Sequence, residues 1–151
     1  MAYAPNVDFD PARDYPLGDK RPDLVTTPSG LHANEVTLEA LRAGSLDPGD
    51  VRATAETLRR QAAVARAAGR EQLAENLLRA AELAGVPEET VLEIYTALRP
   101  WRATAAELEA WAERLESELA APLTAAFVRE ALHVYELRGL LALDERSPAP
   151  V

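Results

Sequence analysis

The spacing of proline most limits what this chain can fold into. Five prolines stand at intervals of five or six residues in the first 34 positions: Pro5, Pro11, Pro16, Pro22 and Pro28. Each fixes its own φ, lacks a backbone donor and pushes the preceding residue towards an extended conformation. A long helix is therefore excluded here, and we expect an irregular arm. Its apolar side chains indicate that the arm packs on another surface and is not disordered. These side chains are Tyr15, Leu17, Leu24, Val25 and Leu31.

Beyond this arm, helix signals follow one another at short intervals. Thr54 is suited to cap a helix, Gly69 interrupts one, and Pro87 with the acids after it begins another. Thr104 and Glu107 have the spacing of a capping box, and Pro122 either kinks a helix or lies in the first turn of the next. The predicted helices cover residues 37–43, 54–68, 70–84, 87–99, 104–119 and 123–141.

Apolar residues recur at helical spacing in these segments and predict their buried faces. The predicted positions are Leu58, Ala62 and Ala65; Leu73, Leu77, Ala80 and Ala84; Val91, Ile94, Tyr95 and Leu98; Leu108, Trp111, Leu115 and Leu119; and Leu123, Phe127, Ala131, Val134, Leu137 and Leu141. No segment alternates as a strand would. The predicted fold is all-α, an open up-and-down helical bundle with an irregular proline-rich N-terminal arm. We expect an arm over residues 1–34, a helical domain over 35–143 and a flexible tail over 144–151.

Composition narrows the possible partners. The chain is 48% hydrophobic but only 5% aromatic, and alanine buries little area, so we expect a thin core that gains stability from a partner. The net charge of −9 disfavours nucleic acid and anionic membranes. No apolar run approaches a membrane span, the first nine residues lack a secretion signal, and there is no cysteine. We therefore expect a cytoplasmic protein.

The sequence offers no active site. His32 and His133 have no partners at metal-ligand spacing, and the Asp8 and Asp10 pair lacks the rest of a calcium loop. Glu130 lies among apolar residues, but an ion pair with a nearby arginine explains it better than a buried catalytic acid. We predict no catalytic, cofactor-binding or metal-binding residue on this chain.

The candidate functional residues are instead those suited to an interface. Trp101 follows a proline in a predicted loop between Arg99 and Arg102, which is typical of an interface anchor. The alternative is a side chain that closes the end of the bundle. Tyr15, Leu17 and Tyr95 are further candidates for a subunit interface. A bundle that associates with copies of itself remains the alternative to a different partner chain.

An ordered series of motifs resembles the small (gamma) subunit of adenosylcobalamin-dependent diol dehydratase and glycerol dehydratase. The series covers residues 15 to 140 and is Tyr15-Pro16-Leu17, Thr27-Pro28-Ser29-Gly30, Val36-Thr37-Leu38-Glu39, Asp50-Val51-Arg52, Glu56-Thr57-Leu58, Gln61-Ala62, Ala68-Gly69-Arg70, Arg79-Ala80-Ala81-Glu82-Leu83, Val86-Pro87, Leu92-Glu93-Ile94-Tyr95, Ala97-Leu98-Arg99-Pro100 and Ala125-Ala126-Phe127-Val128-Arg129-Glu130-Ala131. Each motif is weak alone, but their order is specific.

The resemblance implies a complex with two copies each of large, medium and small subunits. It implies loss of water from propane-1,2-diol, glycerol or a similar diol to give an aldehyde by radical chemistry. Substrate and metal sites would then lie on the large subunit, and cobalamin between the large and medium subunits. The small subunit would contact and support the large one and contribute no catalytic residue. We expect it to be poorly stable when isolated.

The chain also departs from this family. Relatives in bacterial microcompartments often carry a longer amphipathic N-terminal extension, whereas fourteen residues precede Tyr15 here, with Pro5 and Pro11 among them. Encapsulation is therefore possible but not supported by the short N-terminus. Pro122 and the proline-rich acidic C-terminus are further departures.

Overall fold

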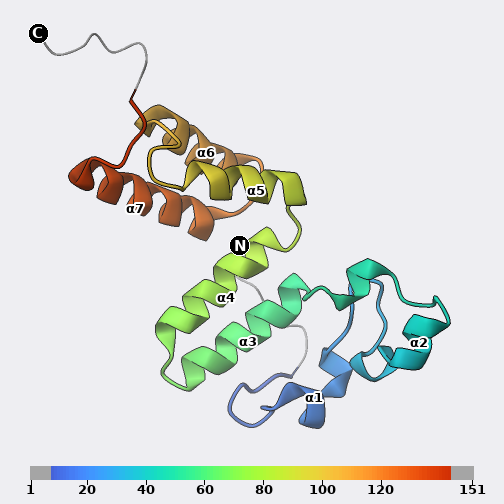
Figure 1. The fold of residues 1–151 in the computed structure, drawn as a ribbon. Helices are drawn as coiled ribbons and strands as arrows, with labels where there is room; N and C mark the ends of the chain where they lie inside the picture. The colour runs from blue at the N-terminus through green and yellow to red at the C-terminus, as the bar shows by residue number, and fades with distance from the viewer. Residues whose placement is uncertain (1–7, 144–151) are drawn as a thin grey trace, which may run out of the picture. The chain divides into compact units, whose positions relative to one another are not determined.

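The computed structural model describes residues 8–143, in which longer irregular segments connect the first helices and short turns connect the later ones (Figure 1). The helices are α1 (Leu17–Lys20), α2 (Leu38–Arg42), α3 (Ala55–Ala67), α4 (Glu71–Leu83), α5 (Glu88–Ala97), α6 (Ala105–Ser117) and α7 (Pro122–Arg138), with 3-10 turns at Pro22–Leu24, Ala33–Glu35 and Pro48–Val51. Over this range there is no strand, only an isolated bridge between Thr26 and His32. The all-α prediction is confirmed.

The described residues belong to two compact units, Met1–Ala84 and Gly85–Val151, which are treated separately below. The arm boundary expected at residue 34 stays a prediction. The tail expected over 144–151 and the start of the chain up to residue 7, including Pro5, lie outside the described residues. No helix in the described part is both long and apolar enough to span a bilayer.

Threonine caps and prolines mark the starts of the helices. The Thr54 hydroxyl accepts a hydrogen bond from the Thr57 amide at 3.1 Å, which caps α3 as predicted. The capping box of Thr104 and Glu107 begins α6. Pro122 is the first residue of α7, so it begins a helix instead of kinking one. Pro87 occupies the N-cap position of α5, one residue before the helix begins, whereas the sequence predicted it as the first helical residue; it makes no side-chain capping hydrogen bond.

Alanines form the contact between α3 and α4, which pack side by side as a helical hairpin (Figure 1). Ala62, Ala65 and Ala74 are buried together, with Leu77 and Leu78 packed against them. Small side chains let the helix axes approach closely, so little large apolar surface is needed between them. The thin core expected from composition is present in this unit.

The predicted buried face of α4 is partly wrong. Leu73 is 43% exposed, and Ala80 and Ala84 are exposed as well. The buried positions are Ala74 and Ala81, each one residue after a predicted position, and Leu77 and Leu78 are partly buried beside them. Residue size alone does not separate the two faces of α4, since Ala80 and Ala84 are exposed while Leu77 and Leu78 pack at the contact with α3.

The N-terminal segment packs on the same chain. Leu17 and Leu24 are buried, and the Arg60 side chain of α3 donates a hydrogen bond to the Leu24 carbonyl at 2.5 Å. Arg60 is 7% exposed and also pairs with Glu56 one turn earlier. Leu17 of α1 lines one groove with Val64 and Ala68, and Figure 1 shows α1 on the α3 side of the α3 and α4 hairpin. The arm is therefore docked, as expected, and the surface beneath it is the chain's own.

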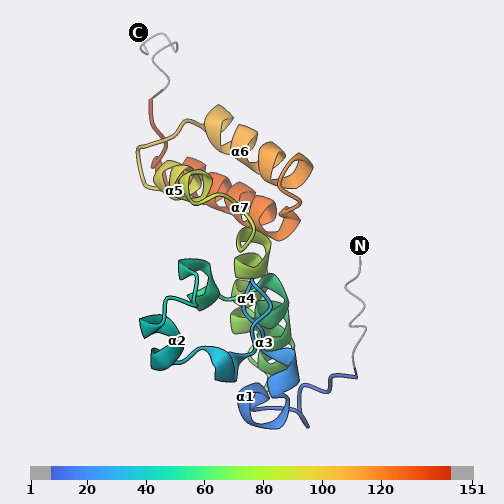
Figure 2. The same cartoon turned by 90° about the vertical axis from the view of Figure 1, so that its right-hand side faces the viewer.

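The second unit holds α5, α6 and α7, with α6 and α7 packed as a second hairpin (Figure 2). Leu108 and Leu115 of α6 and Val128 of α7 are its largest fully buried side chains. The predicted α6 face is thus confirmed, although Leu119 lies past the end of that helix.

The predicted buried faces of α5 and α7 contain errors. On α7, Leu123, Phe127 and Leu137 are 45%, 41% and 74% exposed, while the buried face is Thr124, Ala125 and Val128. On α5, Ile94 is buried but Tyr95 is 66% exposed. In each case the small or branched residue lies at the helix contact and the large residue lies at the surface.

Candidate functional site

The strongest candidate site is the turn between α5 and α6, which we call the Trp101 loop (residues 98–103). Trp101 is 66% exposed, and Arg99 and Arg102 beside it are exposed. Tyr95, one to two turns earlier on α5, is equally exposed. The indole therefore does not close the end of the bundle, which was the alternative for this residue.

Hydrogen bonds fix the Trp101 loop against the end of α7. The Trp101 amide donates to the Leu140 carbonyl at 2.7 Å, and the Ala142 amide donates to the Ala103 carbonyl at 2.9 Å. The Tyr135 hydroxyl donates to the Leu98 carbonyl. The exposed indole is consequently carried on an ordered backbone.

Trp101 adopts a left-handed backbone conformation with φ 60°. A non-glycine residue in this region costs roughly 1–2 kcal/mol. Such strain persists only where the surroundings hold it, and the contacts with Leu140 and Tyr135 supply that support. A strained backbone beneath an exposed tryptophan is more typical of a functional site than of a simple connection.

The other tryptophan has a different environment. Trp111 of α6 is partly buried, and the Arg114 guanidinium lies over its ring, 5.1 Å from the centroid. Trp111 also lines a groove of about 410 Å³ between α5 and α6, together with Leu92, Ala97 and Ala103. It is part of the unit's structure, as predicted for a residue of the α6 apolar face.

The two N-terminal candidates differ from each other. Tyr15 is 58% exposed, whereas Leu17 is buried at 9%. Leu17 therefore contributes to the core of the first unit, and its side chain does not form a free surface. Both line an apolar groove of about 780 Å³ between the N-terminal segment and the α3 and α4 hairpin. Tyr95, Arg99, Trp101 and Arg102 belong to the other unit, so the structure does not define one site from all six residues.

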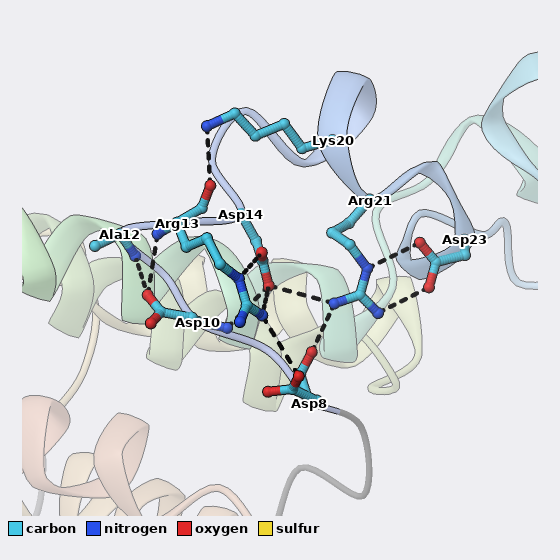
Figure 3. Close-up of polar contacts among 8 residues, drawn as sticks. All are labelled: Asp8, Asp10, Ala12, Arg13, Asp14, Lys20, Arg21 and Asp23. Carbon is cyan, nitrogen blue, oxygen red and sulfur yellow. Dashed lines mark hydrogen bonds and ion pairs between the residues drawn. The ribbon is translucent and has the colours of Figure 1, made fainter.

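An ionic network, which the sequence analysis missed, closes the N-terminal segment on itself (Figure 3). Asp14 is 4% exposed; its carboxylate accepts hydrogen bonds from the Arg13 guanidinium at 2.7 and 3.0 Å and from the Asp10 amide at 2.9 Å. Arg21 adds a contact at 3.3 Å and also pairs with Asp23 at 2.9 Å. The Arg13 hydrogen bond first, and the Asp10 amide second, hold the pKa of Asp14 well below its usual range.

Buried polar groups are the other feature that the sequence did not reveal. Arg60 is described above, and Asp50 is 6% exposed, with its carboxylate accepting the Asp47 amide at 2.9 Å. Both side chains hold turns of the N-terminal segment in place. The acid-then-arginine spacing of Glu56 and Arg60 on one helix face was visible in the sequence, but the burial of Arg60 was not.

The residues weighed for chemistry do not converge. Glu130 and His133 are exposed on α7, and His32 is exposed in the N-terminal segment. Between residues 8 and 143, no three His, Cys, Asp or Glu side chains come together as a metal site requires. Arg129, next to Glu130, instead pairs with Glu109 and Glu116 of α6, each at 2.9 Å.

Large apolar side chains remain exposed in both units. The exposed set is Tyr15, Leu38, Leu41, Val51, Leu73, Leu92, Tyr95, Trp101, Leu123, Phe127, Leu137 and Leu143. In the described part no aromatic residue is buried, and aromatics are the side chains that dominate protein interfaces. Such a surface is typical of a chain that is covered by a partner.

Comparison with known proteins identifies the class of protein to which this chain belongs. Residues 11–142 match the dehydratase small subunit family, and the chain belongs to that family. It is therefore a subunit of a dehydratase that also contains other subunits. The resemblance found in the ordered motifs is confirmed.

Two curated relatives are closely similar. The propanediol dehydratase small subunit of Salmonella typhimurium is 47% identical over 132 residues, which cover 87% of this chain and 76% of the relative. The propanediol dehydratase small subunit of Citrobacter freundii is also 47% identical, over 87% of this chain and 77% of its own.

Proposed function

We propose that this chain is the small subunit of an adenosylcobalamin-dependent dehydratase that removes water from propane-1,2-diol, glycerol or a similar diol to give an aldehyde. The observation that carries the proposal is the match across residues 11–142 to dehydratase small subunits. The two relatives named for propanediol dehydratase support propane-1,2-diol as the first substrate to test. The enzyme would contain a large and a medium subunit as well.

The proposed role of this subunit is structural. It packs against the large subunit and supports it, and contributes no residue to the reaction. The uncovered apolar side chains of both units support this role, because burying them on a partner would stabilise both chains. The net charge of −9 supports protein partners over nucleic acid or anionic membranes.

The proposal assigns the cofactor to the other subunits. When bound there, adenosylcobalamin would supply the radical that takes a hydrogen atom from the substrate. The residues of this chain do not fit such a group well: the groove beside Tyr15 is mainly apolar, and His32 and His133 are exposed on separate elements without further ligands. No step of the reaction is therefore placed on this chain.

Reconstitution tests the proposal. The large and medium subunits from neighbouring reading frames are co-expressed with and without this chain, and aldehyde formation from propane-1,2-diol and from glycerol is measured with added adenosylcobalamin. We expect co-purification of all three chains and higher or longer-lasting activity when the small subunit is present. A small subunit that self-associates and never co-purifies with the others would support the alternative of a free-standing structural bundle.

A further inference from the structure

We propose that the Trp101 loop is the anchor of the small subunit in the enzyme: its indole enters an apolar recess on the large subunit, and Arg99 and Arg102 pair with carboxylates at the rim of that recess. This inference rests on the proposed function, since it names the surface through which the subunit would bind. It follows from the fixed backbone of the loop, the apolar surface beside it on α5 and the charge of its two arginines.

The loop is ordered before any partner binds. Three backbone carbonyls, those of Leu98, Ala103 and Leu140, accept the hydrogen bonds that fix it to the end of α7. An anchor held in place loses less conformational entropy on binding than a flexible one. The positive φ of Trp101 adds to the argument, because glycine would adopt it without strain and would present no side chain.

Apolar surface continues from the loop along α5. Leu92 and Tyr95, one turn apart on that helix, are 57% and 66% exposed, and Leu92 borders the groove of about 410 Å³. Tryptophan, tyrosine and arginine are the residue types that most often dominate binding energy at the centre of an interface. This surface brings all three together within a few residues of sequence.

The charge of the loop selects the chemistry of its partner. Arg13, Arg66, Arg114 and Arg129 pair with carboxylates of their own chain. Within residues 8–143, the side chains of Arg99 and Arg102 form no such pair, and both are exposed on a chain of net charge −9. A guanidinium offers a planar set of donors that suits a carboxylate, so these two are available to an acidic rim.

The same two charges disfavour a second copy of this chain as the occupant. In a symmetric dimer whose two-fold axis passes through the loop, the residues on that axis face their own counterparts. Arg99 and Arg102 would then approach the same cations of the other copy, which opposes association. A different subunit with an acid-bordered recess has no such penalty.

Three single variants test the proposal in the full-length small subunit, with affinity for the purified large and medium subunit complex measured by calorimetry or biolayer interferometry. Trp101→Gly removes the indole and relieves the positive φ, so its Tm should equal or exceed that of the wild type. Its Kd should rise by about thirtyfold, the loss typical of a tryptophan hot spot. Arg102→Glu should raise Kd by about tenfold, and less in high salt.

Arg42→Glu in α2 is the matched charge control. It also reverses an exposed arginine, but in the other unit, and should change Kd by less than about twofold. If wild type binds the large and medium complex but Trp101→Gly binds within threefold of it, the anchor is overturned and the proposed function stands. An equal loss in Arg42→Glu and Arg102→Glu overturns the charge assignment. If the wild-type subunit does not bind the complex at all, the proposed function itself fails.

Discussion

Arg60 offers the most direct test of how the N-terminal segment is held on α3. Its guanidinium donates to the buried Leu24 carbonyl at 2.5 Å and contacts Glu56. Arg60→Met keeps the aliphatic stem but removes every donor. The variant therefore removes the polar link between the two segments without creating a large cavity.

The expected loss follows from the two contacts. A hydrogen bond from a charged donor contributes about 1.5–3 kcal/mol, and its removal leaves the Leu24 carbonyl buried without this partner. The Glu56 side chain is half exposed, so water can replace that contact and little is lost there. Relief from burying a charge offsets part of the total. The local opening free energy of the segment should fall by about 2 kcal/mol.

Hydrogen exchange measured by mass spectrometry on the full chain tests this value. The amides of Thr27 and Ala33, bonded within the segment to the carbonyls of Leu31 and Val25, should exchange about thirtyfold faster in Arg60→Met. Arg66→Met is the control, since Arg66 also lies on α3 but forms an exposed pair with Glu71, the first residue of α4. Equal exchange in wild type, Arg66→Met and Arg60→Met would refute the reasoning.

Three further predictions concern stability. Asp14→Asn should destabilise the N-terminal segment at pH 7. The pKa of Asp14 is lower in the folded protein than in the unfolded chain, so the ionised carboxylate stabilises the fold at pH values above the unfolded pKa of about 4. This contribution is lost progressively as the pH falls below that value. Exchange rates of the variant and wild type should therefore converge in acid, and a gap that does not narrow would contradict this. Leu115→Ala empties a fully buried site and should cost about 2–5 kcal/mol in urea unfolding, whereas Leu137→Ala, at a 74% exposed position, should cost less than about 0.5. Ala120→Gly relieves a φ of 51° between α6 and α7 and should raise stability by about 1 kcal/mol; a lower urea midpoint would count against the strain.

Helix positions were predictable because local chemistry determines them. Thr54 and Thr104 carry oxygens that cap the following amides, and Gly69 takes the left-handed conformation that ends a hairpin helix. These signals depend only on residues three or four positions apart. The sequence therefore placed most helix ends within a residue or two.

Buried faces were harder to predict in an alanine-rich chain. The pattern on α7 pointed to Phe127 and Leu137, but the hairpin buries Thr124 and Ala125. Where helices pack closely, a small residue fits the contact and a large one is displaced to the edge. Periodicity alone cannot separate these two registers, because a helix with both small and large apolar residues offers two overlapping stripes.

The candidate site was partly predictable for a related reason. Pro100 and the helix ends around it place Trp101 in a loop, so its exposure could be anticipated. Its positive φ and the hydrogen bond to Leu140 depend on residues about forty positions later in the chain, which no local pattern reports. The burial of Leu17 could not be anticipated, because only contacts across the fold distinguish a buried leucine from an exposed one in a proline-rich segment.

The two hairpins have a consequence for how the chain acquires its structure. The main helix contacts of each unit, α3 with α4 and α6 with α7, join neighbours in the sequence across short turns. Closing such short loops costs little chain entropy, and folds dominated by local contacts form rapidly. Each hairpin can therefore form early, as soon as its own two helices have been synthesised. A partner met later would then stabilise hairpins that have already formed, by covering the side chains that they leave exposed.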